Sequence, residues 1–103
     1  MRVVWSPLAL GRIVEIAQRI ADDRPIAARE WVGEIFDSVR RLETFPQSGR
    51  TVPELEHRAD LREVVYGSFR IIYRVDPDRI LVLTVRHSRQ VTELEDLDPS
   101  AGT

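Results

Sequence analysis

The chain has 103 residues, of which 43% are hydrophobic and 31% are charged, and its formal net charge is −2. These values are typical of one globular domain built around a single core. The absence of cysteine excludes disulfide bonds, thiolate nucleophiles and cysteine-ligated zinc. The first residues lack a signal-peptide pattern and no apolar run is long enough to span a bilayer, so we expect a cytoplasmic protein without a membrane partner.

The first half of the chain predicts one strand and two helices. Residues 2–6 have the pattern of a short strand, and Ser6 and Pro7 then supply an N-cap and a proline at the first helical position of a helix over residues 8–22. Pro25 opens a second helix that extends to about Thr44. Both helices carry apolar residues every three or four positions, at Leu10, Ile13, Ile16, Ala17 and Ile20 and at Ala28, Trp31, Val32, Ile35, Val39 and Leu42. The short connection between them predicts an antiparallel helical hairpin.

The second half predicts a loop and three strands. Residues 45–50 (FPQSGR) end the second helix, and the polar residues 51–60 predict a surface loop of no regular shape. Strands are expected within residues 61–66, 68–75 and 79–90, with the residues after Arg89 leaving the sheet. The last strand is apolar on both faces until Arg86, which predicts a central strand covered on both sides. The expected fold is α+β in two layers, β-α-α-β-β-β, with the hairpin packed on one face of a small, mainly antiparallel sheet.

Charge is distributed unevenly along the chain. Glu93, Glu95, Asp96 and Asp98 follow the last arginine, so the preceding residues are mildly basic. We therefore expect one domain over residues 1–92 and an acidic, flexible tail over residues 93–103. All fifteen basic residues are arginine, which cannot act as a general base.

The usual catalytic and cofactor-binding motifs are missing. The five glycines are scattered and form no phosphate-binding loop, and no serine lies in a nucleophile elbow. His57 and His87 lie far apart without the spacing of paired metal ligands, so we expect neither a metal site nor a cofactor. His57 lies in the polar loop and is assigned no role.

Basic residues recur in the three late strands. We expect them to gather on one side or edge of the sheet and to form a cationic surface for an acidic partner, nucleic acid or protein: Arg62, Arg70, Arg74, Arg86, His87 and Arg89. Such a group could stabilise a phosphorane-like transition state with His87 as general acid. In the alternative interpretation, Arg70 and Arg74 form the solvated face of an amphipathic strand, and His87 is packed in phase with Leu81, Leu83 and Val85.

Three segments together resemble a known group of proteins. The hairpin ending in FPQSGR, the segment LREVVYGSFRIIYRV and the segment ILVLTVRHSRQ are similar to the RelE/ParE superfamily of bacterial toxins over roughly residues 2–90. The resemblance implies the two-layer fold and a cognate antitoxin whose extended C-terminal segment wraps the toxin. A dimer, or a heterotetramer with the antitoxin, is also compatible with it.

The superfamily contains two activities, and the resemblance favours one of them. RelE-like members cleave messenger RNA on the ribosome with basic residues and commonly a tyrosine or histidine near the C-terminus, whereas ParE-like members poison DNA gyrase. This chain has no lysine, has Ser88 after His87, and has no tyrosine after Tyr73. Its R-H-S-R-Q ending resembles the V-x-H-x-x-R ending of ParE-like proteins, with His87 at the histidine, and its FPQSGR turn is also ParE-like.

The leading hypothesis is a ParE-like gyrase inhibitor neutralised by an antitoxin. The residues predicted to bind the target or the antitoxin are Arg50, Arg62, Arg70, Arg74, Arg86, His87 and Arg89. The alternative is a RelE-like interferase acting on the ribosome and messenger RNA through Arg62, Arg70, Arg86 and His87, with His87, Glu54, Glu56 or Glu63 as the base. A third hypothesis is a degenerate, non-toxic module that only pairs with its antitoxin.

Overall fold

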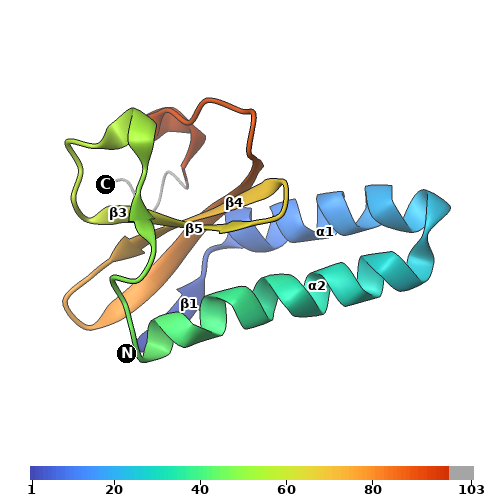
Figure 1. Ribbon diagram of the computed structural model, residues 1–103, viewed down its shortest axis with the longest axis horizontal. Helices are drawn as coiled ribbons and strands as arrows, with labels where there is room; N and C mark the ends of the chain where they lie inside the picture. Colours follow the sequence, from blue (N-terminus) through green and yellow to red (C-terminus); the bar gives the residue numbers. More distant parts are fainter. Residues whose placement is uncertain (98–103) are drawn as a thin grey trace.

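The computed structural model describes residues 1–97. Its helices and strands are β1 (Arg2–Trp5), α1 (Pro7–Asp23), α2 (Pro25–Arg40), β2 (Arg50–Thr51), β3 (Leu61–Tyr66), β4 (Phe69–Val75) and β5 (Arg79–His87). Short 3₁₀ turns follow at Arg41–Glu43, Pro53–Leu55 and Leu94–Asp96. The two helices form an antiparallel hairpin that packs against one face of the sheet. The end of the hairpin where α1 and α2 are joined extends beyond the strands (Figure 1). The predicted α+β architecture is confirmed.

The sheet is mixed, with strand order β1-β5-β4-β3-β2. β1 runs parallel to β5, and every other pair is antiparallel. β1 and β5 can pair in parallel because a long connection, which contains both helices and the strands β2–β4, separates them in the chain. In this register Arg70 on β4 lies between Val65 on β3 and Arg86 on β5, so it belongs to the middle of the sheet.

The first helix is anchored to the sheet by its cap. The Ser6 hydroxyl accepts a hydrogen bond from the Ala9 amide at 3.0 Å and donates one to the Leu83 carbonyl at 2.9 Å. Pro7 occupies the first turn, where its missing amide hydrogen removes no helical bond. The apolar stripes of both helices pack with one face of the sheet in the main core, which contains Ala9, Ile13, Trp31, Ile35, Val39, Leu42, Val64, Ile71, Tyr73, Ile80, Val82 and Val85.

The opposite face of the sheet carries a second core that the chain covers with its own loop and tail. Its members are Val52, Leu55, Leu61, Ile72, Leu81, Leu83 and Leu97. The prediction of a shapeless surface loop over residues 51–60 is therefore wrong, since Val52 and Leu55 are buried. The apolar residues of β5 face both ways, and those turned from the helices need this cover.

The predicted acidic tail is packed as far as the structure describes it. Residues 94–96 form a turn with a capping box between Glu93 and Asp96, and Leu97 is buried in the second core. Leu97 anchors the turn because its burial removes apolar surface from water. Residues 98–103 lie outside the described residues.

A bulge in β5 changes which side chains share a face. Ile72 pairs with Thr84 and Tyr73 pairs with Val82, so Leu83 is the extra residue. Leu81 and Leu83 consequently lie in the second core, whereas Val85 lies in the main core. One inserted residue shifts the strand alternation by one position. The predicted phase of His87 with Leu81 and Leu83 is therefore wrong.

Candidate functional site

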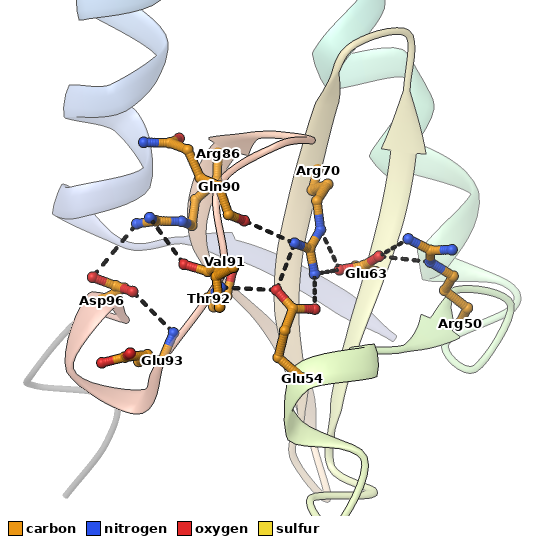
Figure 2. Close-up of polar contacts among 10 residues, drawn as sticks. All are labelled: Arg50, Glu54, Glu63, Arg70, Arg86, Gln90, Val91, Thr92, Glu93 and Asp96. Carbon is orange, nitrogen blue, oxygen red and sulfur yellow. Dashed lines mark hydrogen bonds and ion pairs between the residues drawn. The ribbon is translucent and has the colours of Figure 1, made fainter.

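Arg70 is the centre of a polar network on the face of the sheet opposite the helices (Figure 2). Its Nε and Nη2 donate to Glu63 Oε1 at 2.8 and 2.6 Å. Its Nη1 and Nη2 donate to the two Glu54 oxygens at 2.7 Å each, and Nη1 also donates to the Gln90 carbonyl at 3.1 Å. A guanidinium group has five N–H donors, so every donor of Arg70 has an acceptor within the chain.

Glu63 is the most deeply buried charge of the network. Its side chain has no exposed surface, and its second oxygen accepts a 2.6 Å hydrogen bond from Arg50 Nε. The strand order explains this contact, because Arg50 on β2 is the register partner of Glu63 on β3. Two arginines therefore contact the carboxylate, one at each oxygen, and this pairing offsets the cost of burying the group.

Glu54 connects this network to the C-terminal segment. Its Oε2 accepts hydrogen bonds from Arg70 and from the Thr92 amide, the latter at 2.8 Å. The Arg70 guanidinium, more than any other group, lowers the pKa of Glu54 to about 2, against the partial burial that acts in the opposite direction. A carboxylate with so low a pKa, and with its oxygens engaged by donors, is a weak base.

The network corrects the expectation for Arg70. Only 4% of Arg70 is exposed, and the charges of Arg50, Glu54, Glu63 and Arg70 sum to zero. Arg70 thus belongs neither to an open cationic platform nor to a solvated strand face. The alternation of side chains along β4 correctly predicts which face of the sheet carries Arg70. That face is covered by the loop that contains Val52 and Leu55 and by the C-terminal segment that contains Leu97.

Three further predicted arginines, Arg62 on the helix-covered face and Arg74 and Arg86 on the opposite face, are also engaged within the chain. Arg62 Nη1 donates to the Gly49 carbonyl at 2.9 Å. Arg74 binds Asp76 at 2.6 Å and thereby lowers the pKa of that carboxyl group. Arg86 lies 3.7 Å from Asp96 and donates to the Val91 carbonyl at 3.4 Å. These contacts hold the turn, the hairpin and the tail, and they do not converge on one opening.

The FPQSGR turn is fixed by a buried tyrosine. The Tyr73 hydroxyl donates to the Pro46 carbonyl and accepts from the Gly49 amide, both at 3.0 Å. A Cβ atom at Gly49 would lie 2.5 Å from that hydroxyl and 2.7 Å from the Glu63 carbonyl, so only glycine fits this close approach. The motif that carried the family resemblance has a structural explanation.

His87 and Arg89 remain at the exposed end of β5. The His87 ring packs edge-on against Phe69, with centroids 5.8 Å apart, and its Nδ1 accepts a hydrogen bond from the Arg89 amide at 3.2 Å. Its Nε2 therefore carries the proton in the neutral ring. Arg89 is exposed and makes no ion pair with the residues the structure describes. We call residues 87–89 the terminal patch.

The network carboxylates are hard to recognise from the sequence. It suggests Glu54 and Glu63 only as bases for a nuclease, and it assigns no role to Thr92. Glu63 alternates with Leu61 and Val65 on one face of its strand, and this isolated charge among apolar neighbours is the one signal of a buried ion pair.

Within residues 1–97, no group of three or more histidine, aspartate or glutamate side chains is arranged to hold a metal ion. The described helices also include none with the length and apolar character needed to cross a membrane.

The fold also occurs in chains of two solved toxin–antitoxin systems. A chain of the solved structure described as "Chromosomal ParDE TA system from P. aeruginosa" superimposes with a TM-score of 0.71 at 20% identity, covering 84% of this chain and 95% of that one. A chain of the toxin–antitoxin complex RelBE2 from Mycobacterium tuberculosis superimposes with a TM-score of 0.55 at 19% identity, with the same coverage. At these identities the similarity establishes the fold.

Sequence comparison then identifies the family. The chain is 35% identical over 91 residues to a protein of Sinorhizobium fredii (strain NBRC 101917 / NGR234) named "Putative toxin Y4kP", covering 86% of this chain and 90% of that protein. Residues 3–92 match the family described as "ParE toxin of type II toxin-antitoxin system, parDE". The chain therefore belongs to the ParE toxin family within the RelE/ParE superfamily, as its three segments predicted.

Proposed function

We propose that this toxin acts by docking on DNA gyrase and is neutralised by a cognate antitoxin. Its membership of the ParE family supports the toxin role. The neighbours described as a ParDE system and as a RelBE2 complex support an antitoxin partner. The choice of gyrase over the ribosome rests on the chemistry of the arginine network.

The engagement of both nearby carboxylates is the observation that carries this choice. Cleavage of RNA by its own 2′-hydroxyl requires a group that accepts a proton. Glu54 has its pKa lowered to about 2 by Arg70, and Glu63 is buried between Arg70 and Arg50. Glu54 is therefore a poor proton acceptor at neutral pH, and the Glu63 side chain has no exposed surface that a substrate could reach. A docking function needs no such acceptor.

The terminal patch is the part of the predicted site that remains open to a partner. His87, Ser88 and Arg89 are exposed. They project from the end of β5, and the Arg70 contact to the Gln90 carbonyl fixes the turn that follows them. In this arrangement Arg70 positions the patch, while His87 and Arg89 contact the target.

A gyrase supercoiling assay tests the proposal. The purified protein is expected to inhibit supercoiling, and Arg89→Glu is expected to weaken inhibition about tenfold because like charges at an interface are unfavourable. Arg29→Glu, an exposed arginine on α2 without an ion pair among the described residues, is the matched control and should retain inhibition. Unaltered supercoiling at saturating wild-type protein would refute gyrase as the target.

One observation favours the RelE-like alternative. His87 is exposed and adjoins Arg86 in the chain, and its Nε2 makes no hydrogen bond with the described residues. If the chain cleaves messenger RNA, His87→Ala should abolish ribosome-dependent cleavage, whereas Arg29→Ala should leave it intact. Measuring both activities on the same preparation separates the two functions. Harmless accumulation of the chain in bacteria, with neither activity, would identify the non-toxic module.

A further inference from the structure

A small pocket separates α1 from the ends of β4 and β5. Its volume is about 260 Å³, and Ile16, Ile20, Phe69 and Val85 form its apolar walls. Val85 belongs to the main core, and the other three residues pack against that core. The pocket is therefore a place where the main core reaches the surface beside the terminal patch.

The rim of this pocket is cationic. Arg12, Arg19, Arg86 and His87 line it together with one carboxylate, that of Glu15. Arg12 is paired with Glu15 at 3.0 Å, and among the described residues the one ion pair of Arg86 is the 3.7 Å contact with Asp96. Arg19 makes no ion pair with the described residues. The lining carries more positive than negative charge, so a ligand with an anionic group is favoured.

Arg86 provides a second sign of an unfilled site. Its Nε is buried and has no hydrogen-bond acceptor among the described residues. Buried donors in native proteins almost always have a partner, so an orphaned one beside a pocket requires an explanation. Arg86 also lines the pocket, so an anionic group that enters it would lie against this incompletely paired guanidinium.

We infer that this pocket receives a bulky apolar side chain flanked by carboxylates, presented by an acidic segment of a protein partner. The inference rests on the docking function proposed above and adds a subsite to it. The volume lies below the range of 300–1,000 Å³ of ordinary small-molecule sites and suits one side chain. The apolar walls bind that side chain, and the rim pairs with its acidic neighbours.

The lining favours a protein over a nucleic acid. Glu15 lies in the pocket, and Glu93, Glu95 and Asp96 follow on the tail beside Arg86. These carboxylates repel a continuous phosphate backbone, whereas a peptide can place its two or three acids against the arginines alone. Four apolar walls also exceed what a single stacked base requires.

An NMR titration with short peptides tests the inference without gyrase. The probe is an acetylated and amidated aspartate–tryptophan–aspartate tripeptide, added to uniformly ¹⁵N-labelled full-length protein. One control peptide replaces both aspartates with asparagine, and the other replaces tryptophan with alanine. Uridine monophosphate represents the nucleic-acid alternative. Amide shifts confined to the α1 segment 15–20 and to residues 85–90 are expected for the probe, with at most weak shifts for the controls.

The outcomes separate this subsite from the proposed function. If the alanine peptide caused the same shifts as the probe, the pocket would bind anions without an apolar side chain. If uridine monophosphate caused stronger shifts than the probe, nucleic acid would be the favoured ligand. Either result, or no localised shift, overturns the inference while leaving gyrase inhibition to its own assay. Conversely, localised peptide binding with uninhibited gyrase would support the subsite and refute gyrase as the partner.

A matched pair of variants locates the binding. Arg19→Glu should weaken probe affinity about fivefold, because it replaces an exposed attraction with a repulsion. Arg29→Glu has the same charge change on α2, outside this pocket, and should leave the affinity unchanged. Both positions are exposed, so neither change disturbs the core. Equal weakening by the two variants would show a general charge effect and overturn the site.

Discussion

Removing Arg70 should destabilise the protein more than removing Arg70 and Glu63 together. Arg70→Met keeps most of the side-chain volume but removes all five donors of the network. Glu63, which is 1% exposed, then keeps Arg50 as its only cationic partner. The double variant Arg70→Met with Glu63→Leu leaves no buried charge behind. Arg50 and Glu54 can then turn toward water, because both are partly exposed.

The magnitudes follow from the burial of the two charges. Breaking a buried ion pair by removing one partner costs about 3–5 kcal/mol, whereas replacing the whole pair with apolar groups is often nearly neutral. Because Arg50 still contacts Glu63, we expect Arg70→Met to cost about 3 kcal/mol. The double variant should cost about 1 kcal/mol, which implies a coupling of the two positions of at least ~2 kcal/mol.

Urea unfolding of the wild type, both single variants and the double variant measures this coupling. For a domain of about this size, a loss of 3 kcal/mol corresponds to a fall in Tm of roughly 15 °C, so melting curves provide an independent check. A cost below about 1 kcal/mol for Arg70→Met, the usual limit for exposed ion pairs, would contradict a buried ion pair. A double variant whose loss of stability equals the sum of the two single losses would contradict the predicted coupling.

Two further predictions concern the turn and the response to acid. Gly49→Ala should cost about 2 kcal/mol in urea unfolding, because its Cβ would overlap the Tyr73 hydroxyl. Gly11→Ala, where the new Cβ meets no atom within 4 Å, should instead stabilise the helix by about 0.5–1 kcal/mol, and the reverse ranking would contradict the reasoning. Arg70 lowers the pKa of Glu54 from 4.5 to about 2, so the contribution of Glu54 to stability should be complete above pH 4.5 and should be lost as the pH falls through 2. Glu54→Gln should flatten this part of the curve in acid titrations followed by circular dichroism, and an unchanged acid transition would argue against it.

The secondary structure was predictable because its signals are local. Ser6 and Pro7 marked the start of α1, and regular apolar spacing marked both helices. The three late strands were found from alternation and turn residues. The bulge at Leu83 was not predicted, because all its neighbours in β5 are apolar and the register depends on how the strand meets β4. This single residue reversed the expected face of His87.

The candidate site was only partly predictable. The residue types pointed to a cluster of arginines, and the strand order does bring Arg70 and Arg86 onto neighbouring strands, with Arg50 two strands from Arg70. The carboxylates that neutralise the cluster come from a loop and from the middle of β3. Glu54 reaches Arg70 only because Val52 and Leu55 on either side of it are buried, which is a consequence of packing and not of local pattern.

The sequence alone determined the two helices, the four longer strands and the two-layer architecture, because each depends on residue spacing along the chain, and the resemblance of three segments indicated the family. Only the tertiary structure decided that Arg70 is buried and that its donors are bound within the chain. Alternation assigns a side chain to a face of a sheet, but the cost of a buried charge depends on what covers that face. Here the covering segments supply Glu54 and the Gln90 carbonyl. The sequence predicts that Arg70 contacts a partner, but these segments bind it within the chain. Its hydrogen bond to the Gln90 carbonyl holds the turn that follows the terminal patch.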